Sequence, residues 1–422
     1  MKRILTIGLL FLIIKVQGQD TLTLEMCYDL AVSNYPLTKQ REMIDSYGIE
    51  EQRKLKKNFY PSASLNIQSK YQSDVINISP ESTGAPIPIN IEGEHDSYNA
   101  TLDVKQLIWD GGITKYQRSM AEINTQQKQQ LLESDLFKLK DAITQVYFNC
   151  ILIDKQLNIL EIALENLSEN HKRIVSSYNN GVALKSDLQA IKAELLYTRQ
   201  KIEEAHRNKQ ASLNVLSSYI SKPVTMETPF IIPDNILTEN YEIQRPEIEA
   251  LKLNQQYLEI SKKVAKGSRL PMISAFAQGG YGKPGLNMLS DEFDSYYILG
   301  VSLNWNLWDW QKAKNDKSML SISSDIVETK IENLEQQITI SAIKLQEEIN
   351  KLENTLKLDE EIIVLRSEIK AASSSQLHNG VITSSDYIIA LNDEIQAKLN
   401  YELHKIQMEL AKIQLLNLYG QY

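Results

Sequence analysis

Residues that could carry out chemistry are few in this chain. Its five histidines show no spacing typical of metal ligands and no His-Glu-x-x-His helix; they lie at positions 95, 171, 206, 378 and 404. No Gly-x-Ser-x-Gly elbow or other nucleophile constellation is present. The run from Gly279 to Gly285 is rich in glycine, but it lacks the Gly-Lys-Ser/Thr ending and the following helix of a phosphate loop. The sequence therefore predicts no catalytic, cofactor-binding or metal-binding site, and no enzyme.

Two aspartates stand out by their neighbours instead. Asn180-Gly181-Val182 precedes Ser186-Asp187, and Asn379-Gly380-Val381 precedes Ser385-Asp386. Asn and Gly accept the left-handed backbone that ends a helix, and a hydroxyl with a carboxylate can cap the next one. Each stretch predicts the tip of a helical hairpin. The aspartates are caps alone, or caps that also place a charge at a functional site.

These two tips belong to a duplicated pattern. Ile108-Trp109-Asp110 is answered by Leu307-Trp308-Asp309, and both this pair and the Asn-Gly pair are offset by 199 residues (308 − 109 and 380 − 181). Pro36 and Pro61 are answered by Pro246 and Pro271 at an offset of 210 (246 − 36). Between the two pairs at offset 199, a stretch of 72 residues (181 − 109) recurs without a net insertion or deletion, and such strict length favours rigid helices over loops.

Each copy reads as helix, strand, loop, strand, very long helix and return helix. The first repeat, 19–221, has a first helix from Leu24 to Phe59, a β-hairpin at 62–108, a long helix at 113–178 and a return helix at 184–219. The second repeat, 246–422, has a first helix, a β-hairpin at 272–307, a long helix at 311–377 and a return helix at 384–419. The proline-containing segment 222–245 reads as a linker.

Apolar residues alternate at spacings of four and three along both long helices, which predicts coiled-coil packing. In the first copy they are Leu132, Leu136, Leu139, Ile143, Val146, Cys150, Ile153, Leu157, Leu160, Leu164, Leu167, His171, Ile174 and Tyr178. In the second they are Ile338, Ala342, Leu345, Ile349, Leu352 and Leu356. A helix of this length spans about 100 Å at about 1.5 Å per residue.

The strands alternate apolar and polar residues over about ten positions, which is typical of a strand that crosses an outer membrane. Aromatic residues fall near the strand ends, where an aromatic girdle would lie: Tyr71, Tyr98, Trp109, Tyr281, Tyr297, Trp305 and Trp308. A half-buried antiparallel sheet in a water-soluble protein is the alternative.

Residues 1–18 read as an export signal, with Lys2 and Arg3 before an apolar stretch. Its removal would change the net charge from −9 to about −12 (−9 − 3), so a nucleic-acid partner is not expected. Cys27 and Cys150 fall in apolar helical patterns where cysteine behaves as a small hydrophobe; a disulfide between them is the less favoured alternative.

Four strands cannot close a barrel, yet backbone groups in lipid must be hydrogen-bonded within the protein. Several copies of the chain would have to share one barrel. Two copies would give an eight-stranded barrel, whose interior is largely filled by side chains. Three copies would give a twelve-stranded barrel, which leaves a lumen.

The order of these features resembles the TolC-like outer-membrane efflux factors. The resemblance covers nearly all of the mature chain and rests on the following residues: Leu24, Asn34-Tyr35-Pro36, Tyr60-Pro61-Ser62, Leu107-Ile108-Trp109-Asp110-Gly111-Gly112, Asn379-Gly380-Val381-Ile382-Thr383-Ser384-Ser385-Asp386, Ala390, Leu391 and Ala397. It implies a mainly α fold with a membrane β-barrel: a homotrimer whose twelve-stranded barrel in outer-membrane lipid continues as a long coiled-coil α-barrel in the periplasm.

The resemblance also implies partners: a periplasmic adaptor and an inner-membrane pump of the RND, MFS or ABC type, in efflux or type I secretion. Asp386 matches the position of an acidic constriction, and Asp187 is its equivalent in the first copy. Ile389 replaces a second aspartate, Leu377 a tyrosine and Ile382 an arginine, so an apolar aperture replaces the polar one.

The hairpin tips, 180–182 and 379–381, are then the expected adaptor contacts, because glycine permits close backbone approach. The alternative to an outer-membrane exit channel is an exported coiled-coil structural or adaptor protein without a pore.

Overall fold

The computed structural model describes residues 21–78, 91–234, 237, 241–287 and 290–422. The predicted export signal at 1–18 lies outside these residues. The chain divides into two units. The sheet unit comprises 41–131 and 246–333, and the helical unit comprises 132–245, 334–422 and the residues up to 40.

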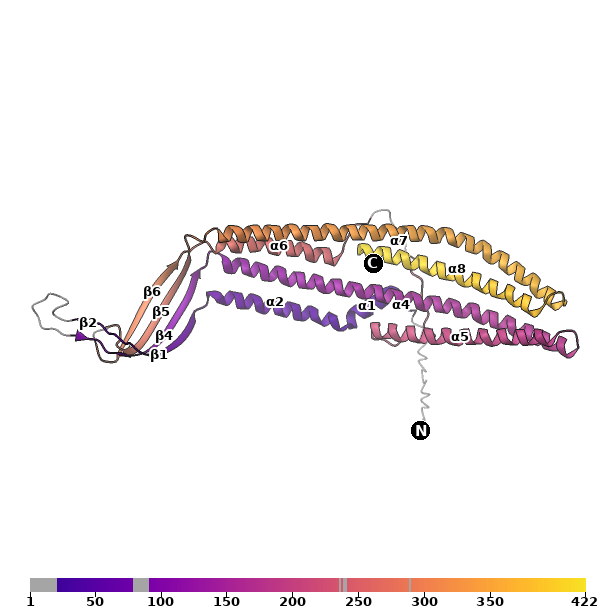
Figure 1. The fold of residues 1–422 in the computed structure, drawn as a ribbon, viewed down its shortest axis with the longest axis horizontal. Coiled ribbons are helices and arrows are strands. Elements are labelled where there is room, and N and C mark those ends of the chain that lie inside the picture. Colours follow the sequence, from indigo (N-terminus) through magenta and orange to yellow (C-terminus); the bar gives the residue numbers. More distant parts are fainter. Residues whose placement is uncertain (1–20, 79–90, 235–236, 238–240, 288–289) are drawn as a thin grey trace, which may run out of the picture. The chain divides into compact units, whose positions relative to one another are not determined.

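Helices and strands follow the predicted order in both copies (Figure 1). They are α1 (Leu24–Asn34), η1 (Pro36–Lys39), α2 (Gln40–Lys56), η2 (Lys57–Phe59), β1 (Ser62–Tyr71), β2 (Asn77–Ile78), β3 (Ile91–Glu92), β4 (Asp96–Trp109), α4 (Ile113–Asn179), α5 (Lys185–Ile220), α6 (Pro246–Gly267), β5 (Met272–Lys283), β6 (Asp294–Asn304), α7 (Lys312–His378) and α8 (Ser384–Tyr419). The mainly helical, duplicated fold class predicted from the sequence is confirmed.

The first helix is not continuous from Leu24 to Phe59, which corrects the prediction. α1 ends at Asn34, and Tyr35 takes an extended conformation with ψ of 136°. Proline disfavours a helical backbone in the residue before it, so Pro36 forces this break. The chain then re-enters a helix through the short 3-10 turn η1.

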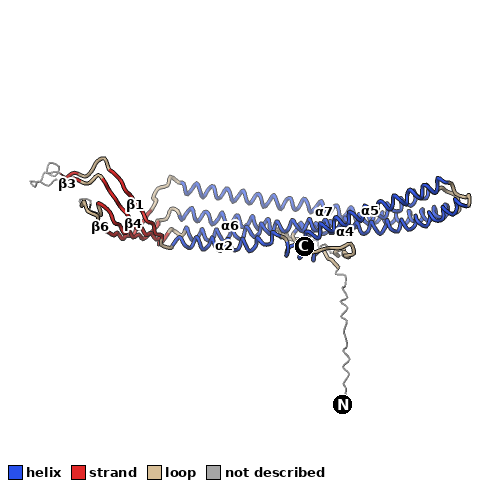
Figure 2. The backbone as a smooth tube through the Cα atoms, turned by 90° about the horizontal axis from the view of Figure 1, so that it is seen from below, coloured by secondary structure: helices blue, strands red, loops and turns tan. Residues whose placement is uncertain are grey.

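Besides a two-stranded sheet of β2 and β3, the strands of the sheet unit, red in Figure 2, form one four-stranded antiparallel sheet in the order β1-β4-β5-β6. β1 and β6 are its edges. The registers align Ala63 with Val104, Val104 with Ala277, and Ala277 with Leu299. Within the paired strands, the apolar positions predicted from alternation therefore share one face, and the polar positions share the other.

Two details of the strands depart from the prediction or refine it. β6 ends at Asn304, so Trp305 follows the strand instead of lying within a hairpin that reaches 307. The register between β4 and β5 shifts between Leu107 and Trp109. This irregularity pairs Trp109 with Ile273 and so brings its indole to the apolar face.

Both long helices begin after the same left-handed turn. The carboxylate of Asp110 accepts hydrogen bonds from the amides of Gly112 (2.9 Å) and Thr114 (2.7 Å). Asp309 does the same for Gln311 (3.0 Å) and Ala313 (3.1 Å). A carboxylate there satisfies amides that the helix itself leaves unpaired. α4 and α7 then each run for 67 residues.

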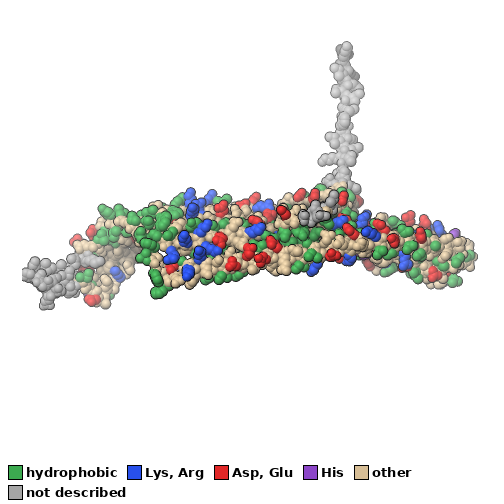
Figure 3. Space-filling model, turned by 90° about the horizontal axis from the view of Figure 1, so that it is seen from above, with side chains coloured by type: hydrophobic (Ala, Val, Ile, Leu, Met, Phe, Trp, Pro, Cys, Tyr) green, Lys and Arg blue, Asp and Glu red, His purple; other side chains and the backbone are tan. Residues whose placement is uncertain are grey.

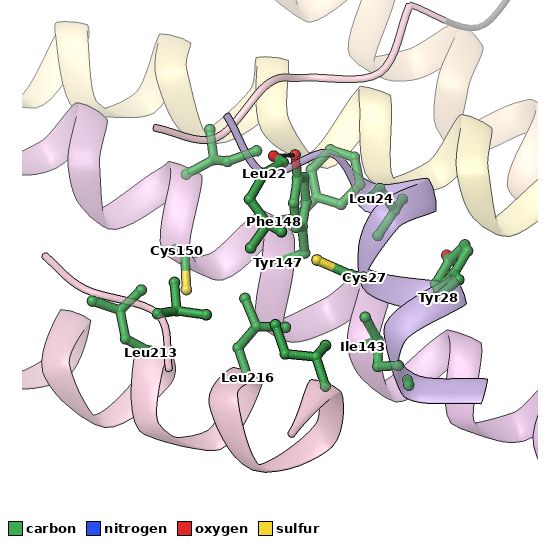
Figure 4. Packing of buried hydrophobic residues seen from close by; sticks show 14 of the residues in the cluster. Leu22, Leu24, Cys27, Tyr28, Ile143, Tyr147, Phe148, Cys150, Leu213 and Leu216 are labelled. Atoms are coloured by element: carbon green, nitrogen blue, oxygen red, sulfur yellow. Dashed lines mark hydrogen bonds between the residues drawn. The ribbon is translucent and has the colours of Figure 1, made fainter. Parts of the chain in front are cut away.

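The helical unit buries the predicted apolar seam of α4. Its seam residues from Leu132 to Ile174 are buried or half-buried, and only Tyr178 at its end is exposed. A large core cluster joins α1, α4 and α5 (Figure 4). Cys27 and Cys150 lie in it as free thiols, so the disulfide alternative is wrong. Burial raises the pKa of both thiols to about 12, which keeps them protonated and unreactive.

Tyr147 is the polar centre of this cluster, and its side chain is fully buried. Its hydroxyl lies 2.8 Å from the carbonyl oxygen of Leu22 and 2.7 Å from that of Ile231, and it accepts the Ile231 amide at 3.1 Å. Leu22 also forms a parallel bridge with Phe230. One side chain of α4 thus fixes both the start of the described chain and the linker.

No helix among the described residues combines the length and the apolar character needed to cross a bilayer.

Replacing Tyr147 with phenylalanine should lower the free energy of unfolding by about 1–3 kcal/mol, because buried backbone groups would lose their partner. Denaturant titration followed by circular dichroism measures this. Tyr178→Phe is the control, since that ring is partly exposed, and should change stability by less than about 0.5 kcal/mol. Equal effects in the two variants would contradict the assigned role.

Candidate functional site: the hairpin tips and the two faces of the sheet

Both hairpin tips close with the same backbone motif. Gly181 has a φ of +76° and Gly380 a φ of +71°. The Val182 amide donates to the Ser177 carbonyl (2.8 Å) and the Gly181 amide to that of Tyr178 (3.0 Å). The second tip repeats both bonds. Only glycine adopts this backbone freely, so the two Asn-Gly pairs end α4 and α7 as predicted.

The capping hydroxyl differs from the prediction. The side chain of Thr383 accepts the Asp386 amide at 3.3 Å, and the Asp386 carboxylate accepts the Thr383 amide at 3.0 Å. This is a capping box, readable from the sequence as Thr-x-x-Asp. Ser385 and Ser186 do not supply the cap. In the first copy Leu184 replaces the threonine, so only the Asp187 half remains, accepting the Leu184 amide at 3.3 Å.

Asp187 has a second bond that the sequence did not indicate. Its other carboxylate oxygen accepts the backbone amide of Ser384 at 2.9 Å. Asp187 thereby joins the first hairpin to the second. Nearby, the Asn170 side chain donates to the Tyr387 hydroxyl at 2.7 Å, and Tyr387 is almost fully buried.

The two aspartates therefore have different surroundings. Both oxygens of Asp187 are bound by backbone amides, whereas Asp386 is exposed and binds Thr383 through one oxygen. The hydroxyl and then the amide of Thr383 hold the pKa of Asp386 below its ordinary value. The stabilisation from this cap is present above the unfolded pKa of about 3.9, and it is lost as the pH falls through the lower folded pKa. At neutral pH Asp386 is a charged, accessible carboxylate.

The apolar residues at the tips also separate into two groups. Leu377 is buried in an apolar cluster, and Ile382 packs against that cluster. We call it the tip cluster; its buried members are Leu160, Ala163, Leu167, Ile174, Ile191, Leu377, Tyr387, Leu391 and Ile395. By contrast, Ile389 is 62% exposed, one helical turn beyond Asp386. Val182 and Val381 are still more exposed, at 77% and 71%. A Cβ added to Gly181 or Gly380 would meet nothing within 4 Å.

Above the second tip, a cluster of charges holds α7 against α8. Glu394 accepts from Lys398 (2.9 Å), Ser367 (2.9 Å) and Lys370 (3.2 Å). Burial acts to raise the pKa of this carboxyl, but these three donors outweigh it and leave the pKa below its ordinary value. Glu394 is therefore ionised, and the cluster fixes the hairpin.

The apolar face of the sheet is exposed along its length. Ile67 on β1 and Leu299 on β6 are 77% and 70% accessible. Tyr71, Tyr98, Tyr281 and Tyr297 lie toward the loop end of the strands, and Trp109, Trp305 and Trp308 toward the helix end. From Tyr98 to Trp109 a strand extends about 36 Å at about 3.3 Å per residue; tilted by about 45°, it spans about 25 Å.

The opposite face carries a hydrogen-bonded polar network that sequence reasoning missed. The Asp103 carboxylate accepts from Asn66 (2.6 Å), Thr101 (3.0 Å) and Gln278 (2.6 Å), which joins β1, β4 and β5. The alternation signals polarity here, but only the register brings these side chains together.

Among the described residues, no group of three or more His, Cys, Asp or Glu side chains could hold a metal ion.

Comparison with protein-family models and with curated proteins gives no match. Solved structures do match over nearly the whole chain. The outer membrane protein VceC from Vibrio cholerae is 13% identical with a TM-score of 0.69, over 94% of this chain and 96% of that one. CusC, in structures concerning transmembrane channel formation, is 12% identical with a TM-score of 0.74, over 94% and 92%. The CmeC outer membrane channel of Campylobacter jejuni is 13% identical with a TM-score of 0.68, over 94% and 85%.

The chain therefore has the fold of outer-membrane channels. The resemblance to TolC-like channels stated from the sequence is confirmed at the level of the fold.

Thr383→Ala should loosen the first turn of α8, because it removes the hydroxyl half of the capping box; such losses cost about 0.5–2 kcal/mol. Hydrogen exchange of the Asp386 and Tyr387 amides should accelerate. Ser385→Ala is the matched control and should leave exchange unchanged. Faster exchange in the control alone would assign the cap to Ser385 after all.

Proposed function

We propose that this protein is a passive exit channel in an outer membrane, with its helices in the periplasm. One observation carries the proposal: the sheet exposes an apolar face, keeps a polar network on the other, and ends in two unpaired edges. Lipid against the first face and water against the second suit this arrangement.

The unpaired edges support a shared barrel. Backbone groups of β1 and β6 need partners in lipid, and β1 of one copy can pair with β6 of the next. A trimer closes twelve strands around a lumen, whereas a dimer closes eight, whose side chains would fill the interior. The aromatic residues at both strand ends would form the two girdles.

At the tips we assign different roles to the two aspartates. Three exposed Asp386 carboxylates around one axis would attract cations, and their mutual repulsion would favour opening. Ile389 on the same exposed stretch would form an apolar ring beside them. Asp187 and Ile382 support this aperture without lining it, because one is bound by backbone amides and the other is packed in the tip cluster.

The tips also suit a protein partner. Val182 and Val381 are exposed apolar side chains next to glycines with open space around them. These positions, with Asn180 and Asn379, are our proposed contacts for a periplasmic adaptor. An inner-membrane pump would supply the energy in efflux or type I secretion.

The second candidate is an exported coiled-coil structural or adaptor protein without a pore. The long heptad-packed helices favour it as much as they favour a channel. This second function does not explain the exposed apolar face of the sheet, because a water-soluble scaffold would cover such a face.

Fractionation distinguishes the two functions. The protein should remain in the membrane pellet after high-salt and carbonate washes and should dissolve only in detergent, as a trimer. A trimer is expected because its twelve strands pair every sheet edge and leave a lumen. Release by carbonate as a water-soluble species would exclude the channel.

Asp386→Asn should reduce the cation preference of single channels in planar bilayers, because it removes three fixed charges from the constriction. Reversal potentials in a salt gradient measure it. Asp393→Asn, seven residues further along α8, is the control: that carboxylate is already paired with Arg366 at 2.7 Å. Unchanged selectivity in Asp386→Asn would remove the acidic aperture and leave the channel intact.

A further inference from the structure

Four chain segments meet at the helix end of the sheet. The strands are antiparallel in the order β1-β4-β5-β6. The residues before β1, after β4, before β5 and after β6 therefore lie at the same end of the sheet. These segments are residues 53–60, 110–118, 259–270 and 309–317. All belong to the sheet unit.

The four segments are strongly basic in an acidic protein. The whole chain has a net charge of −9, yet they hold thirteen Lys and Arg against four carboxylates, Asp110, Glu259, Asp309 and Asp316. We call the thirteen cations the basic collar: Arg53, Lys54, Lys56, Lys57, Lys115, Arg118, Lys262, Lys263, Lys266, Arg269, Lys312, Lys314 and Lys317. Figure 3 shows Lys and Arg gathered on the helices next to the sheet.

Most of these charges are available to an outside partner. All except Lys262 are exposed. Arg53 pairs with Glu50, Lys262 with Glu259, and Arg269 lies 3.9 Å from Asp309. For the other ten cations, no carboxylate lies within ion-pair distance in the described part of the chain. Such an excess of unpaired positive charge repels itself unless an anion neutralises it.

Exposed indoles lie at the same end of the sheet. Trp305, Trp308 and Trp310 are exposed, Trp310 by 84%. The backbone of Trp310 is left-handed, with a φ of 52°, and that of Gln311 likewise, at 64°. The first copy has Gly111 and Gly112 at these places, where the conformation costs little. A large side chain in such a conformation is destabilising, and this turn presents the Trp310 indole to the surroundings of the sheet.

Lysine next to tryptophan, at the boundary of an apolar face, is typical of protein at a lipid headgroup layer. We propose that the basic collar, with these indoles, binds the phosphodiester headgroups of anionic phospholipids in the leaflet at the helix end of the sheet. The proposal rests on the part of the proposed function that puts the sheet in lipid. It adds a lipid preference and a depth: the headgroups lie level with the first turns of α4 and α7.

The test uses the full-length protein in mixed micelles with equal amounts of phosphatidylglycerol and phosphatidylcholine. Native mass spectrometry counts the lipids retained. A collar variant carries Lys57→Gln, Lys115→Gln, Lys266→Gln and Lys312→Gln, one change from each segment. The control removes four exposed lysines elsewhere, with Lys172→Gln, Lys192→Gln, Lys330→Gln and Lys357→Gln.

The wild type and the control should retain the anionic lipid in preference by about fivefold or more, since one basic side chain at an anionic surface contributes about that factor. The collar variant should lose most of this preference and retain the two lipids in amounts within about twofold of each other, and 1 M salt should weaken the preference of the wild type. Inorganic phosphate at the lipid concentration should not compete. A collar variant as selective as the wild type, an equal loss in the control, or displacement by free phosphate would overturn the proposal.

The two proposals fail separately, because the micelle assay needs no pore. A protein that prefers anionic lipid and never conducts overturns the channel. One that conducts without the lipid preference overturns the collar.

Discussion

Hydrogen bonding at the two edges of the sheet is the constraint on which the rest of the structure depends. β1 and β6 each present a row of backbone amides and carbonyls on one side. In water these groups would be solvated, whereas in lipid, the environment proposed for the apolar face, they would need protein partners. In the proposed membrane location, association between copies would follow from the sheet itself, before any contact between helices is considered.

The helices take their places from the same sheet. All four strands connect to helices at the same end of the sheet. α2 and α6 precede β1 and β5, and α4 and α7 follow β4 and β6. The Asp110 and Asp309 turns fix the start of the two long helices with matching hydrogen bonds. The tips then close with matching glycines. Asp187 and Ser384 join the two hairpins across these symmetric parts.

Much of this could be read from the sequence, because it depends on local periodicity and on residues with restricted backbones. The heptad seam of α4, the alternation of the strands and the two Asn-Gly turns are of this kind. The break at Pro36 was also readable, and was missed because the flanking apolar pattern suggests one helix. Contacts between distant positions were not accessible. The Asp187–Ser384 bond, the Asp103 network and the position of Trp109 after a register shift depend on tertiary alignment that no local pattern encodes.

The equal lengths of the paired helices restrict how this chain can change in evolution. α4 and α7 each have 67 residues, and α5 and α8 each have 36. Four residues added to α4 alone would move one tip by about 6 Å along its axis, far outside the reach of a hydrogen bond. Insertions in one copy must therefore be matched in the other. Between the two strands of each hairpin, by contrast, the copies differ by 11 residues (210 − 199).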